Sequence, residues 1–177
     1  LLAVLASVGV VVAAEDLAVL IVAWSASSLG LHHLLMFYRD RRAAIIVAHK
    51  KFIASRLAEV LLVAAAGLLY MALGTLRIPE IGAAFGSGTA LPLATEAAAV
   101  CIALAVVIKS AQLPVHGWLI QVMEAPTPVS ALLHAGVVNI GGYVLIRLAP
   151  LIAASHAAQV LLVVFGSTTA VLGGLVM

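Results

Sequence analysis

Charged residues are scarce in this 177-residue chain, where nine Lys and Arg and seven Asp and Glu make up only 9% of the sequence. About a quarter of the residues in an ordinary soluble domain are charged, so this chain cannot cover a water-facing surface of the usual composition. A net charge of only +2 argues against a nucleic acid as partner. Because 65% of the residues are hydrophobic, disorder is excluded as well. The composition predicts an integral membrane protein whose partner is the lipid bilayer.

Cysteine occurs once, at Cys101, so no internal disulfide can form. Aromatic residues make up 5%, whereas small and aliphatic residues dominate, as in transmembrane helices that pack through small side chains. Alternating strands, a Gly-rich phosphate loop, a Cys cluster and a Ser/His/Asp arrangement are all missing from the sequence. We therefore expect an all-α, polytopic transmembrane bundle with no metal, cofactor or redox chemistry of its own. Both ends lie in apolar runs, so we expect an internal fragment of a larger protein.

A helix needs about 20 apolar residues to cross a bilayer. On this measure 1–177 forms a single transmembrane domain with one partial span followed by five crossings. Pro114 interrupts the fourth of these six segments, because proline cannot donate a backbone hydrogen bond and its ring crowds the carbonyl group of Ser110. The helix should break there. The expected segments are 1–14 (partial), 17–37, 52–74, 91–119 and 128–148, with 151–177 as the last.

The segment Arg39–Lys51 holds five of the nine Lys and Arg. Cytoplasmic loops of membrane proteins are enriched in these residues, so we expect this loop to face the cytoplasm from the cell (inner) membrane. Its charge is either a topology signal or a binding surface for lipid or for a partner protein.

Lys109 is the clearest ionisable residue predicted to lie within the membrane. It follows nine small or apolar residues, 100–108, and precedes Pro114 by five positions. A charge at this depth is costly and normally marks an ion or proton path. Irregular backbone at the same depth is tolerated only inside protein or beside a wet cavity. The alternative is a lysine that snorkels to the interface.

Three other residues fit the same path. Glu59 lies three positions after Arg56, so the two can pair on one helix face, either to tune charge transfer or only to fix packing. His134 shares a helix face with Ser130 and Gly141, so it can line a water wire or make one interhelical hydrogen bond. His116 lies just past the expected break and could continue the path from Lys109.

Two stretches, KSAQLPVHGWL (Lys109–Leu119) and MEAPTPVSALLHA (Met123–Ala135), resemble the core signature of the proton-translocating antiporter-like subunits. That family includes the large membrane-arm subunits of respiratory complex I and of multisubunit Na⁺/H⁺ antiporters. The resemblance implies an inverted-repeat bundle, of which this chain would hold most of the first five-helix repeat. It also implies that Lys109 is the lysine of the broken helix, that His134 is a relay and that Glu59 is the acidic residue after Arg56.

The chain departs from the respiratory members at several positions. The resemblance implies a glutamate after Trp24, where this chain has Ser25, and an acidic residue at Gln121, with proline at Ile120. The stretch 24–57 is more similar to a divergent branch, the NADH dehydrogenase subunit 5-like membrane subunits of two-component inorganic-carbon accumulation systems. That branch implies a cation flux that energises a large, zinc-containing, carbonic-anhydrase-like partner on the cytoplasmic side.

Three hypotheses follow. The first is a proton- or Na⁺-conducting subunit that energises uptake of CO₂ or bicarbonate. The second is a proton-pumping subunit of a respiratory NADH–quinone oxidoreductase or a Na⁺/H⁺ antiporter. The third is a scaffold that does not conduct and that anchors a soluble enzyme.

Overall fold

The computed structural model describes residues 1–36, 42–85, 91–120 and 127–176. Over these ranges the chain is helical and contains no strand, as the sequence predicts. A π-helical turn, η2, lies between α7 and α8. The elements are α1 (Leu2–Ala13), α2 (Leu17–Leu35), α3 (Arg42–Leu73), α4 (Ile78–Phe85), α5 (Leu93–Lys109), α6 (Gly117–Ile120), α7 (Thr127–Leu132), η2 (Leu133–Val137), α8 (Ile140–Arg147), α9 (Ala149–Ala154) and α10 (His156–Val176).

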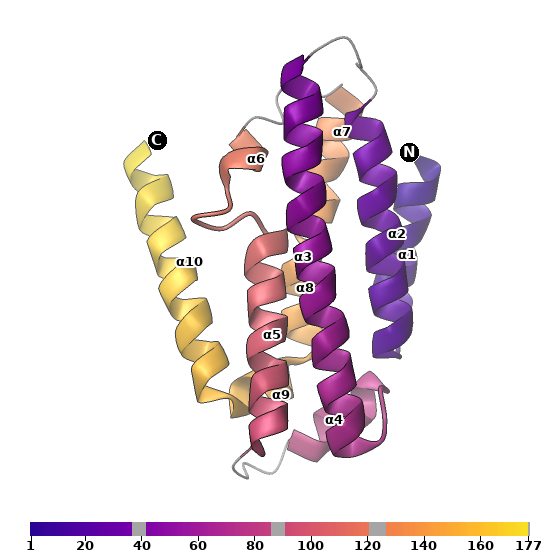
Figure 1. The fold of residues 1–177 in the computed structure, drawn as a ribbon, viewed down its shortest axis with the longest axis vertical. Helices are drawn as coiled ribbons and strands as arrows, with labels where there is room; N and C mark the ends of the chain where they lie inside the picture. The colour runs from indigo at the N-terminus through magenta and orange to yellow at the C-terminus, as the bar shows by residue number, and fades with distance from the viewer. Residues whose placement is uncertain (37–41, 86–90, 121–126, 177) are drawn as a thin grey trace.

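The long helices α2, α3 and α5 run side by side, with α1 packed on α2 and α8 packed on α5 (Figure 1). Small side chains let these helices approach each other closely, as in membrane proteins generally. Ala58 and Ala65 of α3, and Ala99 and Ala103 of α5, are all fully buried. Helices α4 and α9 contact each other and close the end of the bundle opposite the start of α3 (Figure 1).

Three of the described helices are long and apolar enough to cross a membrane by length and composition: Leu17–Leu35, Ile45–Leu73 and His156–Leu175. Large hydrophobic side chains on their outer surfaces are exposed, among them Val22, Ile53 and Val163. Such a surface is unfavourable in water and is suited to lipid. The protein is therefore a membrane protein, as its composition predicts.

Helix α3 begins ten residues before the expected start at 52, so His49, Lys50 and Lys51 are helical and do not lie in a loop. Neither Gly nor Pro occurs between Arg42 and Gly67, and basic side chains are compatible with a helix. With 32 residues, α3 is about 48 Å long, well beyond the hydrocarbon thickness of about 30 Å. The hydropathy pattern located only its apolar part. Arg39 to Arg41 lie outside the described residues.

Other expected segments are subdivided. The segment 128–148 becomes α7, η2 and α8, and the segment 151–177 is interrupted at Ser155, whose extended backbone separates α9 from α10. Helix α4 lies in the connection between the expected segments 52–74 and 91–119. Local hydrogen bonding explains these interruptions, since η2 contains a bond from Val138 N to Leu133 O of 3.1 Å, and the Ser155 hydroxyl accepts from Ala158 N at 3.1 Å to begin α10.

Side chains of α8 hold the end of α1. The hydroxyl of Tyr143 donates to Val12 O at 2.7 Å, and Arg147 donates through Nη2 to Ala14 O at 2.6 Å. The last carbonyl groups of a helix lack partners within it, and a cation there also complements the helix dipole. Arg147 therefore joins α1 to the bundle, which accounts for a basic residue at the end of α8.

Candidate cation-transfer site

Lys109 is the last residue of α5, and its side chain is only 4% exposed. Its Nζ donates a hydrogen bond to the hydroxyl of Ser28 on α2 and lies 4.8 Å from the ring centre of Trp24. The face of an indole ring attracts a cation. Lys109 therefore points into the bundle towards α2, which excludes the alternative of a snorkelling lysine.

Helix α5 ends at Lys109 because the backbone changes direction over the next residues. Ala111 has a φ of 52°, a left-handed conformation that is unfavourable for a side chain larger than glycine. The amide of Gln112 bonds to Val107 O at 3.2 Å, five residues back, and α6 begins only at Gly117. In Figure 1, α5 stops partway along the bundle and a non-helical connection leads to α6. The break predicted around Pro114 is therefore present.

The close packing of α8 supports this break. A Cβ atom on Gly141 would lie 2.5 Å from Ser110 Oγ and 3.1 Å from Val106 Cγ1, so a larger residue would require these side chains to move. Ser110 directly follows Lys109. The packing of α8 therefore holds the turn that presents the lysine.

A second buried lysine, Lys51 of α3, shares the same serine. Its side chain is 2% exposed, and its Nζ donates to the carbonyl oxygen of Ser28 at 2.8 Å. Ser28 therefore accepts one bond through its hydroxyl and one through its carbonyl group, from lysines on two different helices. The sequence predicts Lys51 in a cytoplasmic loop, and its pattern gave no signal for Ser28. The spacing of Lys51, Ser55 and Glu59, four residues apart on one helix face, was the signal that could have identified Lys51.

The ion pair predicted between Arg56 and Glu59 is present, with Nη2 and Oε1 2.7 Å apart. The other carboxylate oxygen of Glu59 accepts a bond of 2.7 Å from the hydroxyl of Ser25 on α2. Ser25 occupies the position where the resemblance to respiratory subunits implies a glutamate. In this chain the carboxylate near that position belongs to α3, and Ser25 binds it.

Three polar contacts join α2 to α3 along one interface, which we call the α2–α3 seam. The two antiparallel helices pair Ser25 with Glu59 and Ser28 with Lys51, and His32 Nδ1 lies 3.3 Å from Ala48 O. Ser55 is also buried on the same face of α3. The seam comprises Ser25, Ser28 and His32 of α2 with Lys51, Ser55 and Glu59 of α3.

The remaining predicted residues are less closely connected. His116 lies in the connection between α5 and α6, and its Nδ1 is buried without a hydrogen-bond partner, like Oε1 of nearby Gln112. No hydrogen bond joins His116 to Lys109 in the described part of the chain. His134 belongs to η2, and its side chain lies outside the described residues. π-Helical turns occur frequently at functional sites, but the relay role of His134 stays a prediction.

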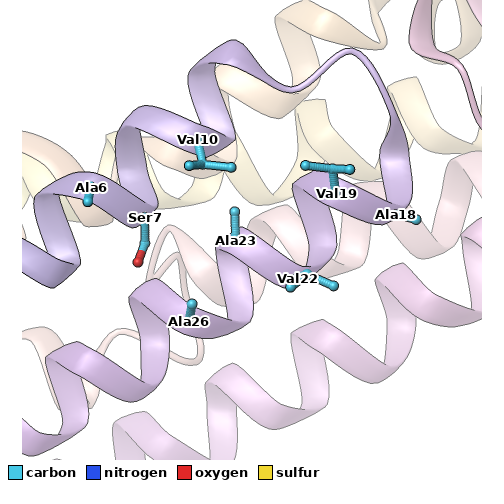
Figure 2. A pocket seen from close by; sticks show the side chains of 8 residues that line it. All are labelled: Ala6, Ser7, Val10, Ala18, Val19, Val22, Ala23 and Ala26. Carbon is cyan, nitrogen blue, oxygen red and sulfur yellow. The ribbon is translucent and has the colours of Figure 1, made fainter.

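An apolar groove of about 490 Å³ lies elsewhere, between α1 and α2 (Figure 2). Its one polar side chain, Ser7, bonds to Ala3 O within its own helix. The groove therefore offers no group for charge transfer. Its lining residues are Ala6, Ser7, Val10, Ala18, Val19, Val22, Ala23 and Ala26. The described residues also contain no group of three or more His, Cys, Asp or Glu that could hold a metal ion.

Known proteins share this sequence and this fold. The chain is 50% identical to the probable inorganic carbon transporter subunit DabB of Hydrogenovibrio crunogenus over 177 residues, which are 34% of that protein. It is 32% identical to NADH-quinone oxidoreductase subunit L of Mycobacterium tuberculosis, over 97% of this chain and 27% of that protein. A chain of the Mrp complex from Dietzia sp. superposes with a TM-score of 0.88 at 33% identity, over 97% of this chain and 19% of that one.

The chain thus spans about a third of the length of the inorganic carbon transporter subunit and less of the other two proteins. The structural match confirms the predicted fold class, and the similar sequences confirm the resemblance seen in the signature around Lys109. Residues 14–177 match the model of the family described as NADH:quinone oxidoreductase/Mrp antiporter, TM. The chain belongs to this family of membrane antiporter-like subunits.

Proposed function

We propose that this chain forms part of a membrane subunit that conducts protons or Na⁺ and so energises the uptake of CO₂ or bicarbonate. The observation that carries this proposal is the buried amine of Lys109 at the break of α5, bonded to Ser28. An ionisable side chain next to irregular backbone inside a bundle is the usual arrangement of an ion or proton path. The ion pair of Arg56 and Glu59 supplies charges near this path.

Two observations favour inorganic carbon over respiratory coupling. Relatives named as probable inorganic carbon transporter subunits are 50%, 48% and 40% identical to this chain, whereas the NADH-quinone oxidoreductase subunit L is 32% identical. Ser25 also replaces the glutamate that the resemblance to respiratory subunits implies.

The proposed partner is a large, soluble, zinc-containing protein of carbonic-anhydrase type, bound on the cytoplasmic side near the start of α3. The proposed location is the inner membrane.

A respiratory NADH–quinone oxidoreductase or Na⁺/H⁺ antiporter is the second candidate, favoured by the TM-score of 0.88 with a chain of the Mrp complex. The proteins that copurify with the full-length subunit distinguish the two. A single large zinc protein supports inorganic-carbon uptake. Flavin and iron–sulfur subunits, or the set of small Mrp-type subunits, support the second candidate.

The role of Lys109 is tested by Lys109→Ala in the full-length subunit with its partners, reconstituted in vesicles. We expect proton or Na⁺ flux under an imposed membrane potential to fall by about 10²-fold or more, because a positioned proton-transfer group typically contributes 10²–10⁴-fold. Arg77→Ala is the control, since Arg77 is a cation with a 63% exposed side chain that directly precedes α4, at the opposite end of the bundle from the start of α3. Undiminished flux in Lys109→Ala would refute the carrier role. Absence of flux in the unmodified complex would favour the scaffold hypothesis.

A further inference from the structure

We propose that Lys51 is a second proton carrier, which exchanges a proton with Lys109 through the hydroxyl of Ser28. The α2–α3 seam then forms the route between Lys109 and the end of the bundle where α3 begins. This inference rests on the proposed function and extends it, because it names the proton as the transported ion and the seam as its path.

The contacts at Ser28 bring the two amines to one residue. Lys109 donates to the serine hydroxyl and Lys51 to the serine carbonyl group, and Ser28 itself is buried. Because Lys109 donates to a lone pair of the Ser28 hydroxyl oxygen, the hydrogen of that hydroxyl can serve a second acceptor. A neutral Lys51 amine keeps a lone pair for this bond while it still donates to the carbonyl oxygen.

The transfer step conserves charge and atoms. Lys109, as an ammonium group, gives one N–H proton to the Ser28 hydroxyl oxygen while that hydroxyl gives its own proton to the neutral amine of Lys51. One N–H bond breaks at Lys109 and one forms at Lys51, and the serine ends as the same hydroxyl. The reverse step returns the proton from Lys51 to Lys109.

The balance of charge in the site favours such sharing. Lys51, Lys109 and Arg56 are three basic groups near the single carboxylate of Glu59, and Lys51 lies within electrostatic range of the other three groups, so with both lysines protonated the site would hold excess positive charge. Buried charge without compensation is unfavourable. A proton that is shared by two lysines relieves this excess without breaking the ion pair of Glu59 with Arg56.

Histidines continue the route beyond Lys51. His32 lies one turn past Ser28 and is half-buried, whereas His33 and His49 are exposed, with ring centres 6.1 and 5.8 Å from that of His32. Imidazole gains and loses protons near neutral pH. Solvent contact therefore increases from the buried Lys51 to the half-buried His32 and then to the exposed His33 and His49, and Ser28 and His33 are only about 8 Å apart along α2.

The chemistry of the seam suits a proton better than Na⁺. Hard metal cations require several oxygen ligands. The carboxylate of Glu59 is already bonded to Arg56 and Ser25, and two lysines occupy the oxygens of Ser28. Amines and imidazoles pass protons and repel a metal cation.

The experiment measures proton flux by a pH-sensitive dye in vesicles that contain the full-length complex, at fixed membrane potential, with Na⁺ or with choline. Lys51→Gln keeps an N–H donor that can bond to the Ser28 carbonyl group. Its amide group, however, neither gains nor releases a proton near neutral pH. Lys51→Arg keeps the positive charge, but guanidinium does not release its proton in proteins. Ser28→Ala removes only the hydroxyl group, and Ser28→Thr retains one. Arg77→Gln is the control on an exposed cation beside α4.

We expect Lys51→Gln, Lys51→Arg and Ser28→Ala to lower the flux about tenfold or more. Arg77→Gln should stay within about twofold of the unmodified protein, Ser28→Thr should retain clearly more flux than Ser28→Ala, and choline should replace Na⁺ without effect. Wild-type flux in Lys51→Arg would show that only the charge is needed, which overturns the proposal. If Lys51→Gln does not fold, Lys51→Arg and the two Ser28 variants carry the test.

Lys109→Ala separates this inference from the proposed function. If Lys109→Ala abolishes flux while Lys51→Gln and Ser28→Ala conduct normally, the seam is not the path but the role of Lys109 stands. If Lys109→Ala conducts normally, the proposed function itself fails. If the flux requires Na⁺, the inference that the proton is the transported ion is wrong.

Discussion

A lysine is stable in the interior of a protein when its N–H groups find acceptors, and in this chain a single serine supplies an acceptor to each of two lysines. Ser28 accepts from Lys109 and from Lys51 through two different oxygens. Glu59 is held in a similar way, because Arg56 and Ser25 each donate to one of its oxygens. The site thus depends on individual hydroxyl groups of α2 that face cations and a carboxylate of other helices.

Removal of the charge of Glu59 tests this arrangement. Glu59→Gln leaves Arg56 without its counter-charge, so we expect a loss of about 1–3 kcal/mol in the free energy of unfolding and a lower Tm in detergent. The lower part of this range is expected because Arg56 is 36% exposed.

Glu80→Gln is the matched control, because Arg77 and Glu80 form the same i, i+3 pair but are 63% and 50% exposed. Exposed pairs contribute little, so this variant should change the stability by no more than about 0.5 kcal/mol. Equal changes in Tm for the two variants would mean that burial does not strengthen the pair of Glu59.

Among the elements, α5 and α8 are coupled at the point where α5 ends. The turn after Lys109 contains Ala111 with positive φ, and the backbone of α8 lies so close to this turn that a Cβ atom on Gly141 would displace the side chains of Ser110 and Val106. Glu96 of α5 accepts a bond of 3.1 Å from Ala157 N, at the start of α10. Helix α5 is therefore held at both of its ends by later parts of the chain.

Gly141→Ala should displace α8 from the end of α5. Its new Cβ atom would lie 2.5 Å from Ser110 Oγ, so we expect a loss of about 1–3 kcal/mol in stability, measured as Tm. Flux should fall as well, since Ser110 adjoins Lys109.

Gly142→Ala is the control, because nothing lies within 4 Å of the corresponding Cβ position. Alanine favours a helix over glycine by up to about 1 kcal/mol, so Gly142→Ala should be neutral or stabilising. A Tm for Gly141→Ala as high as that for Gly142→Ala would contradict this account.

On the scale of the whole molecule, the bundle has two chemically different ends. The start of α3, with His49 and Lys50, lies at one end, and α4 with Glu80 lies at the other (Figure 1). The bias of basic residues towards the cytoplasm therefore gives a testable orientation.

Single cysteines in a cysteine-free, full-length protein would reveal this orientation. We expect Glu80→Cys to react with a membrane-impermeant maleimide in intact cells, and His49→Cys to react only after permeabilisation. Neither side chain is buried inside the protein, so packing within the bundle does not account for a difference between them. The opposite labelling pattern would reverse the proposed topology and place the soluble partner on the other side.

Local signals in the sequence determined a large part of this description. The scarcity of charge and the long apolar runs predicted a helical membrane protein, since hydropathy is summed over neighbouring residues. Pro114 predicted the break near Lys109, and the i, i+3 spacing predicted the pair of Arg56 and Glu59, because both effects act within one or two turns of a helix. The signature around Lys109 also indicated the family.

Only the tertiary structure decided which helix faces meet. It moved the start of α3 from Phe52 to Arg42 and placed Lys51 in the interior, where the sequence had suggested a loop. It also brought Ser28 to both lysines and Ser25 to Glu59, over separations of 23 to 81 residues. The physical reason is that periodicity along a helix identifies a polar face but not its partner, which depends on how helices distant in sequence pack together.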